Sequence, residues 1–243
     1  MTKNKIDLSI VIPAYNEKNR LPKTLKIICD FFSNRQDIAH EIIVVDDGSA
    51  DDTQGAAESL GQKEIKALSY KINRGKGYAV NYGVSKAEGD FILFADADNS
   101  TPFEQIEKFL SNRDEFDVII ASRYLAKSNI KIKQPFLRRL GAKIGNLMIR
   151  TMLLPKIKDT QCGFKMFRKS AAREIFSRQT IWRWGFDIEI LYIAKKLGYK
   201  IKEVPVDWFN DEGTRIQSPM VFLSTLSELF RIKLNSLQKK YRR

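Results

Sequence analysis

The sequence predicts one α/β domain built on a mostly parallel β-sheet that is flanked by helices. Two observations support this fold class. Short apolar runs bounded by turn-forming residues alternate with segments of helical periodicity, which is the pattern of consecutive βαβ units. The chain also has 243 residues, of which 43% are hydrophobic, and this suits one large globular domain with a substantial core. We therefore expect residues 1–243 to form a single domain.

The predicted elements alternate regularly through the first half of the chain. Apolar runs place strands at residues 8–12, 41–45, 65–70, 90–95 and 118–122. Helix-like segments lie between them at residues 21–32, 52–60, 77–87 and 103–110. Ligands of such sheets bind beyond the carboxyl ends of the strands. Acidic or amide side chains follow three of these strands, namely Asn16, Asp46, Asp47, Asp96 and Asp98.

The most informative strand end is Asp96-Ala97-Asp98, which follows the apolar run 91–95. Residues two apart on extended backbone point to the same side, so both carboxylates leave the strand together. A pair of hard oxygen ligands suits a divalent cation bound together with a phosphate-bearing substrate. An ordinary acidic loop after a buried strand would look the same, but two other strands with similar ends favour a binding site.

Beyond residue 131 the sequence predicts amphipathic helices. Residues 136–154 follow Pro135, and one helical face would carry Phe136, Leu137, Leu140, Ile144, Leu147 and Met148. Another face would carry Arg139, Lys143 and Arg150. A helix of this kind lies in a membrane interface or buries its apolar face in the core. Residues 219–243 repeat the pattern less cleanly, with a face of Phe222, Leu226, Leu229, Phe230 and Leu237. The last five residues, Lys-Lys-Tyr-Arg-Arg, suit anionic headgroups or a solvated tail.

Charge is divided unequally between the two halves. The formal net charge is +13, but residues 1–130 carry 17 Lys and Arg against 20 Asp and Glu, which is −3. Residues 131–243 carry 25 against 9, which is +16. This segregation indicates an acidic partner for the second half. Nucleic acid, anionic lipid and a phosphorylated acceptor all qualify.

Composition also disfavours several classes of protein. No apolar stretch approaches the length of a membrane span, and the N-terminal residues do not resemble a signal peptide. Cys29 and Cys162 lack metal-site spacing, so we expect two reduced thiols in a cytoplasmic protein. The single histidine, His40, has no evident partner, which argues against histidine-based catalysis.

Four further motifs accompany the acidic strand ends. They are Asn73-Arg74-Gly75-Lys76-Gly77, Ser122-Arg123-Tyr124, Asp159-Thr160-Gln161-Cys162-Gly163-Phe164-Lys165 and Trp184-Gly185-Phe186-Asp187-Ile188-Glu189, together with Trp208. Over roughly residues 7 to 235 the chain resembles the family 2 glycosyltransferases, which have the GT-A fold. Within that family it is similar to the dolichyl-phosphate β-glucosyltransferases. The seven-residue string that ends at Lys165 is the most specific part of the resemblance.

The resemblance implies a nucleotide-sugar site in residues 1–130. Asp98 would be a ligand of Mg²⁺ or Mn²⁺, and Asp96 would lie near the ion and the ribose or donor sugar. Ser100 stands where mannose-using relatives often have a glutamine ligand, which leaves the rest of the metal shell open. Lys76 would approach the nucleotide, unless its turn simply begins a helix. The base and ribose would be enclosed by Pro13, Ala14, Tyr15, Glu17 and Asp47, with Asp46 either beside them or structural.

For the acceptor side, the charge and the amphipathic helices lead us to expect that the basic second half, residues 131–243, faces the acceptor and a membrane. The candidates for binding the acceptor phosphate are Arg123, Arg138 and Arg139, because a guanidinium group can donate two parallel hydrogen bonds to phosphate oxygens. The sugar and acceptor site would be lined by Gln161, Lys165 and Trp208. Asp187, with Glu189, matches the general base of relatives that use hydroxyl acceptors. A phosphate acceptor is already ionised near neutral pH, with a second pKa of about 6, and needs little proton abstraction.

These expectations combine into one predicted activity. A peripheral protein on the cytoplasmic face of a membrane would transfer a hexose, foremost glucose from UDP-glucose, to a dolichyl or undecaprenyl phosphate, with inversion and with a divalent metal. A family 2 transferase acting on a sugar hydroxyl is the alternative. A nucleic-acid-binding module is a third hypothesis, but the acidic strand ends would repel a phosphate backbone and no aromatic platform interrupts the basic stretch. We therefore expect no nucleic-acid partner.

Overall fold

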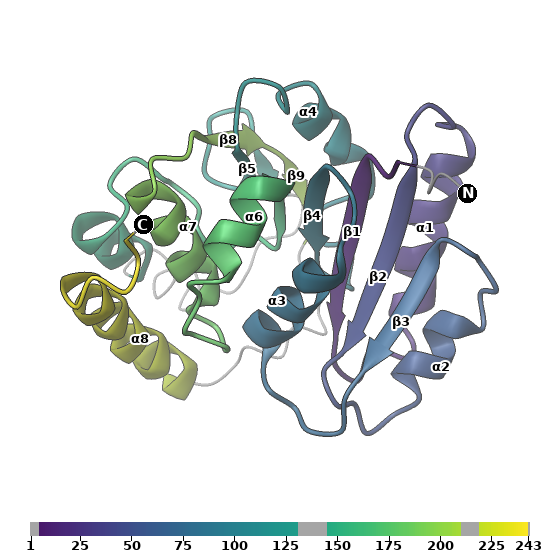
Figure 1. The fold of residues 1–243 in the computed structure, drawn as a ribbon, viewed down its shortest axis with the longest axis horizontal. Coiled ribbons are helices and arrows are strands. Elements are labelled where there is room, and N and C mark those ends of the chain that lie inside the picture. The colour runs from purple at the N-terminus through teal and green to yellow at the C-terminus, as the bar shows by residue number, and fades with distance from the viewer. Residues whose placement is uncertain (1–4, 131–144, 210–218, 243) are drawn as a thin grey trace.

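The computed structural model describes residues 5–130, 145–209 and 219–242, and in the last range it describes side chains from residue 227 onward. A seven-stranded sheet runs through the molecule in the order β3-β2-β1-β4-β7-β5-β8 (Figure 1). Its strands are β1 (Leu8–Ala14), β2 (His40–Asp46), β3 (Ile65–Ser69), β4 (Phe91–Ala95), β5 (Val118–Ser122), β7 (Phe164–Arg168) and β8 (Ile201–Pro205). The predicted α/β fold is confirmed.

Strand direction is parallel except at β7, which runs antiparallel to both of its neighbours, β4 and β5. The strands β1, β4 and β5 are buried along their whole length, as expected for strands covered on both faces. The edge strand β3 has only exposed and partly buried residues. The carboxyl ends of β1, β2 and β4 therefore lie together at one end of a rigid layer.

Helices cover both faces of this sheet. On one face lie α3 (Lys76–Lys86), α6 (Lys169–Phe176), α7 (Phe186–Lys196) and α8 (Pro219–Leu237), whose apolar residues share a core with Val11, Val45 and Phe94. On the other face lie α1 (Leu21–Ser33), α2 (Thr53–Glu58), and α4 (Ile106–Leu110) with its preceding 3₁₀ turn η1 (Phe103–Gln105). Figure 1 shows α3 in front of the sheet and α1 behind it.

A second, two-stranded sheet lies beside the first. In it β6 (Asn129–Ile130) pairs in parallel with β9 (Asp207–Trp208). This pairing joins the end of the first half of the chain to the segment after β8. It also fixes the backbone that carries Trp208.

The predicted helix at residues 136–154 is described only in part. Residues 145–152 are helical, whereas Arg138, Arg139 and Lys143 lie outside the described residues. Within the described part, Leu147 is 61% exposed and Ile149 is buried. Met148 of the predicted face packs against the core beside Ile149, so burial of that face in the core is wrong only at Leu147 among these residues. The membrane-interface alternative stays a prediction.

The helix α8 has two apolar faces rather than one. Leu229 and Ile232 are buried, and they belong to the core that also contains residues of α7. The outer stripe, which consists of Phe230, Leu234 and Leu237, is exposed. The prediction that Leu229 shares a face with Phe230 and Leu237 is therefore wrong. In the described part of the chain, no helix is both long enough and apolar enough to cross a membrane.

Candidate active site

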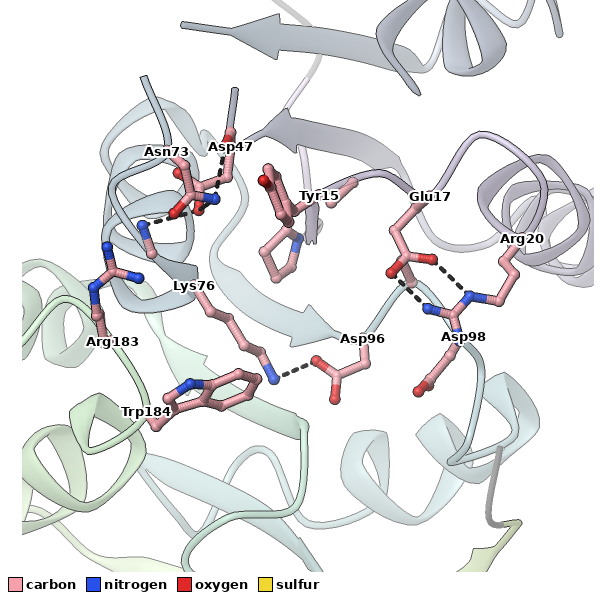
Figure 2. A pocket seen from close by; sticks show the side chains of 14 residues that line it. Tyr15, Glu17, Arg20, Asp47, Asn73, Lys76, Asp96, Asp98, Arg183 and Trp184 are labelled. Atoms are coloured by element: carbon pink, nitrogen blue, oxygen red, sulfur yellow. Dashed lines mark hydrogen bonds and ion pairs between the residues drawn. The ribbon is translucent and has the colours of Figure 1, made fainter. Parts of the chain in front are cut away.

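A pocket of about 360 Å³ opens at the carboxyl ends of β1, β2 and β4. Most of its lining comes from the loops that follow these strands, and Figure 2 shows the side chains that point into it. The lining residues are Pro13, Ala14, Tyr15, Glu17, Arg20, Asp47, Asn73, Gly75, Lys76, Asp96, Ala97, Asp98, Arg183 and Trp184. All of the residues predicted to contact the nucleotide are among them, except Asp46.

Asp46 supports the loops instead of lining the pocket. Its Oδ1 accepts a hydrogen bond from the Ser49 amide at 2.9 Å. The Ser49 hydroxyl in turn accepts from the Asn16 amide at 2.8 Å, and the Asn16 side-chain oxygen accepts from the Ala50 amide at 2.7 Å. Asn16 itself has a positive φ of 52°. These bonds tie the loop after β1 to the loop after β2.

Asp47 holds the opposite wall. It is buried, and its two carboxylate oxygens accept four hydrogen bonds. The donors are the Tyr70 hydroxyl at 2.8 Å, the Asn73 side-chain amide at 2.9 Å, and the backbone amides of Arg74 at 2.8 Å and Gly75 at 2.9 Å. Four donors hold this carboxylate in one orientation. Asp47 therefore shapes the turn that leads into α3.

This turn requires glycine at position 75. Gly75 has a φ of 100°, and a Cβ there would lie 2.5 Å from the carbonyl oxygen of Trp182. That same carbonyl accepts a hydrogen bond from the Gly77 amide at 2.8 Å. The turn and the segment around residue 182 are thus in direct backbone contact. Between the two glycines, Lys76 is directed into the pocket (Figure 2).

Lys76 meets the acidic pair of β4. Its Nζ lies 2.5 Å from the Asp96 carboxylate. Burial alone would lower the pKa of Lys76, but the carboxylates of Asp96, Asp187 and Asp98 together raise it above its ordinary value. The lysine is therefore a permanent cation at neutral pH. Such a group can bind a diphosphate that competes for it with Asp96.

The backbone around Asp96 and Asp98 is held by three hydrogen bonds. The Asp96 amide donates to the Gly163 carbonyl at 3.0 Å, and the Thr24 hydroxyl donates to the Ala97 carbonyl at 2.6 Å. The Asp98 Oδ1 accepts from the Ser100 amide at 2.9 Å. A Cβ at position 163 would collide with the Asp96 carboxylate, so the motif glycine makes room for that side chain.

These two carboxylates suit a divalent cation. Burial, followed by the neighbouring charge of Asp96, raises the pKa of Asp98 above its ordinary value. A cation bound between them would relieve this repulsion. In the described part of the chain, no cluster of three His, Cys, Asp or Glu side chains could hold a metal ion. The donor set therefore fits an ion such as Mg²⁺, which is bound by one or two carboxylates and completed by phosphate oxygens and water.

Asp187 and Lys165 form an ion pair beneath the pocket. Lys165 is fully buried, and its Nζ lies 2.5 Å from the Asp187 carboxylate and donates to the Cys162 carbonyl at 2.6 Å. Asp187, in the first turn of α7, is only 5% exposed. Neither residue lines the pocket. Lys165 is buried because it lies on β7, in the middle of the sheet.

Arg123 is engaged by a second buried carboxylate. Its guanidinium binds Asp159 through two hydrogen bonds of 2.7 and 3.0 Å, and its backbone amide donates to the same residue at 2.9 Å. The guanidinium also lies over the ring of Trp208, at 5.3 Å from the centroid. Trp208 and Asp96 line a much smaller second cavity, beside Gly163. Gln161 is exposed and lines neither cavity.

Six of the lining residues are not among the predicted site residues. Four of them, Asn73, Gly75, Ala97 and Trp184, stand inside quoted motifs, and that was the signal that could have identified them. Arg20 follows Glu17 by three residues, and the two side chains form a pair of hydrogen bonds at 2.6 and 2.7 Å across the rim of the pocket (Figure 2). Arg183 reaches the pocket from the second half of the chain and has no comparable sequence signal.

Comparison with known protein families agrees with this geometry. Residues 9–176 match the family model described as Glycosyl transferase family 2. The chain belongs to this family. It is 36% identical over 252 residues to a dolichyl-phosphate β-glucosyltransferase of Dictyostelium discoideum, a match that covers 97% of this chain and 77% of that protein. It is 30% identical over 258 residues to the protein of that name in Saccharomyces cerevisiae, and this match covers 98% of this chain and 77% of that protein.

Solved structures support the fold assignment of this family 2 glycosyltransferase. A mannosyl-3-phosphoglycerate synthase of Rubrobacter xylanophilus superposes with a TM-score of 0.71 at 20% identity, covering 98% of this chain and 76% of the other. A glucosyl-3-phosphoglycerate synthase of Mycobacterium tuberculosis, solved with Mn²⁺, UDP and phosphoglyceric acid, gives a TM-score of 0.64 at 18% identity, covering 98% and 79%. These structures confirm the expected GT-A fold. The family match and the curated relatives confirm the glycosyltransferase class.

Proposed function

We propose that this enzyme transfers glucose from UDP-glucose to a polyprenyl phosphate such as dolichyl phosphate, with inversion at the sugar. The glycosyltransferase class follows from the family, and the acceptor is the one in the names of the curated relatives. The pocket at the ends of β1, β2 and β4 is the donor pocket. It supports this assignment because it places the cation Lys76 beside the acidic pair Asp96 and Asp98.

The donor would lie with its nucleoside against Pro13, Ala14, Tyr15 and Glu17, and with its diphosphate toward Lys76. A glucosyl-3-phosphoglycerate synthase of the same fold has been solved with Mn²⁺ and UDP-glucose. In this chain Asp98 and Asp96 would hold Mg²⁺ or Mn²⁺. The ion supplies positive charge to the diphosphate as it leaves. Residues 1–130 are thus the nucleotide-sugar half, and they contribute every lining residue except Arg183 and Trp184.

The observation that carries the acceptor assignment is the buried pair of Asp187 and Lys165. A general base must reach the proton that it removes and must be free to take it. Asp187 is instead shielded from solvent, and its carboxylate is held by the Lys165 ammonium group 2.5 Å away. A phosphate acceptor needs no such base, because its oxygen is already ionised. The arrangement therefore favours a phosphate over a hydroxyl acceptor.

Residues 131–243 form the acceptor half in this proposal, and they would meet a membrane surface. The half carries a formal charge of +16. The outer stripe of α8 adds exposed apolar side chains beside the exposed basic residues Arg231 and Lys233. This combination is typical of helices that lie in the interface of an anionic bilayer. Peripheral attachment to the cytoplasmic face would bring the donor pocket to its lipid acceptor. The phosphate-binding roles of Arg123, Arg138, Arg139 and Gln161 stay predictions within this proposal.

A donor panel tests the proposal. Purified enzyme is incubated with UDP-glucose, UDP-N-acetylglucosamine or GDP-mannose, with Mg²⁺ or Mn²⁺ and dolichyl phosphate, and sugar in the organic extract is counted. We expect UDP-glucose to give the fastest transfer and mild acid to release the sugar, as in a glycosyl phosphate. Transfer confined to GDP-mannose, or a product that survives mild acid, would contradict the proposed donor or acceptor, respectively.

A further inference from the structure

The donor pocket is completed by a loop from the second half of the chain. Residues 180–184 precede α7 and supply Arg183 and Trp184 to the lining. The loop is held against the rest of the pocket by the Trp182 carbonyl, which accepts the Gly77 amide at 2.8 Å. At its other end, the Gly185 amide donates to the Glu228 carboxylate of α8 at 2.8 Å. The position of this loop therefore bears directly on the shape of the pocket.

Glu189 anchors the start of the loop. This residue of α7 is fully buried, and its carboxylate accepts four hydrogen bonds. Three come from the loop: the Thr180 amide at 2.9 Å, the Ile181 amide at 2.8 Å and the Thr180 hydroxyl at 2.6 Å. The fourth comes from the hydroxyl of Tyr241 at 2.6 Å. A buried carboxylate needs all of these donors to offset its loss of hydration.

Tyr241 brings the C-terminal end of the chain into this cluster. Although it lies within the basic segment 239–243, the tyrosine is only 1% exposed. Asn235 of α8 completes the cluster, because its side-chain amide donates to the Thr180 hydroxyl at 2.9 Å and to the Tyr241 hydroxyl at 3.2 Å. Burial, followed by the hydrogen bond to Glu189, raises the pKa of Tyr241 above its ordinary value, so the phenol stays protonated and donates.

We propose that Tyr241 and Glu189 are positioning residues for donor binding, and that the C-terminal segment clasps the loop 180–184 in the shape that the nucleotide requires. The clasp extends from Tyr241 through Glu189 to Thr180, and from there to the carbonyl of Trp182 and the turn that carries Lys76. The inference rests on the proposed function only in taking the pocket as the nucleotide site. Residues 239–242 then serve donor binding, although they lie far from residues 1–130 in the sequence.

Tyr192 offers a matched control within the same interface. Its ring packs against that of Tyr241 with centroids 6.1 Å apart, and its hydroxyl lies 3.0 Å from the Ser236 hydroxyl of α8. Tyr192→Phe and Tyr241→Phe therefore each remove one hydroxyl from the packing of α7 against the C-terminal segment. Of the two, only the Tyr241 hydroxyl is bonded to the carboxylate that holds the loop. A difference in UDP affinity between the two variants therefore separates the effect of the hydrogen bond to Glu189 from the effect of general packing.

The test measures UDP binding by titration calorimetry in excess Mg²⁺, after thermal unfolding has shown which variants are folded. We expect Tyr241→Phe to raise the UDP Kd roughly five- to tenfold, because it deletes a buried hydrogen bond to a charged group. Tyr192→Phe should stay within about twofold of the wild type. Thr180→Val should weaken binding in the same way as Tyr241→Phe, whereas Thr180→Ser keeps the hydroxyl and should retain affinity.

Hydrogen exchange of residues 177–186 in the ligand-free protein provides the second readout. Tyr241→Phe should speed exchange there, and Tyr192→Phe should not. A UDP Kd that is the same in Tyr241→Phe, Thr180→Val and the wild type overturns the inference while leaving the proposed function intact. A wild-type protein that binds no UDP overturns both, because the pocket is then not the nucleotide site.

Discussion

At the scale of single residues, the acidic pair of β4 shows how a binding site opposes folding. Burial and the charge of Asp96 raise the pKa of Asp98, so the folded state favours the protonated acid. A group whose pKa is raised by folding contributes to stability at low pH. This contribution is lost as the pH rises through the pKa of the group in the folded state. At neutral pH ionised Asp98 therefore destabilises the fold, and a bound cation would offset this cost.

The first prediction concerns Asp98→Asn. Without metal, this variant should unfold at the same temperature as the wild type or a few degrees higher, because it removes a repulsive charge. Mg²⁺ should raise the Tm of the wild type but not that of the variant, and sugar transfer should fall by about 10²-fold or more. Asp30→Asn, at an exposed surface ion pair with Lys26, is the control and should change neither. Full transfer by the wild type in excess EDTA would refute the metal assignment.

The second prediction concerns the buried pair Lys165 and Asp187. Removal of one partner leaves an uncompensated charge in the interior, so Lys165→Met should lower the free energy of unfolding by about 3–5 kcal/mol. The double variant Lys165→Met, Asp187→Leu should lose less than the sum of the two single changes. Urea denaturation measures the free energy of unfolding of the two single variants and of the double variant. Strict additivity would mean that the two groups do not interact as the 2.5 Å contact indicates.

At the scale of elements, the turn before α3 is the most constrained part of the donor pocket. Gly75→Ala should weaken donor binding and lower stability, because the added Cβ meets the Trp182 carbonyl at 2.5 Å in a backbone of positive φ. Gly61→Ala is the matched control, since its φ of +61° is also positive but nothing lies within 4 Å of an added Cβ. Gly61→Ala should lower the free energy of unfolding by about 1 kcal/mol without changing UDP affinity. Equal UDP affinities for the two variants would contradict the role of this turn.

The elements also show what sequence reasoning could and could not predict. The first five strands were predicted almost to the residue, because buried apolar runs between turn residues have a strong period and clear ends. The antiparallel place of β7 in the sheet was not predicted, since no local pattern indicates that a strand from residue 164 inserts between β4 and β5. For that reason Lys165 was expected in the acceptor wall but lies buried under the pocket. Arg183 was missed because only tertiary packing brings its loop to the pocket.

At the scale of the whole molecule, residues 131–243, the proposed acceptor half, combine positive charge with the outer stripe of α8. Phe230, Leu234 and Leu237 are 59%, 53% and 71% exposed. We predict that the protein sediments with anionic liposomes at low salt and is partly released at high salt, because screening weakens the electrostatic attraction. Replacing the three residues of the outer stripe with Ser should reduce binding. Ile72→Ser, at another exposed apolar residue, should not. Liposome binding that changes neither with lipid charge nor with replacement of the outer stripe would contradict the assignment of this surface to the membrane.

The central claim is that the enzyme joins glucose to a phosphate oxygen of a lipid. It is tested most directly by offering equal amounts of dolichyl phosphate and dolichol to the enzyme with UDP-glucose and Mg²⁺, and by following the extracted lipid with ³¹P NMR. We predict that glucose is transferred only to dolichyl phosphate, and that the phosphomonoester resonance is replaced by that of a phosphodiester. Transfer of glucose to dolichol, or a glucosylated lipid whose phosphomonoester resonance is unchanged, would contradict the claim.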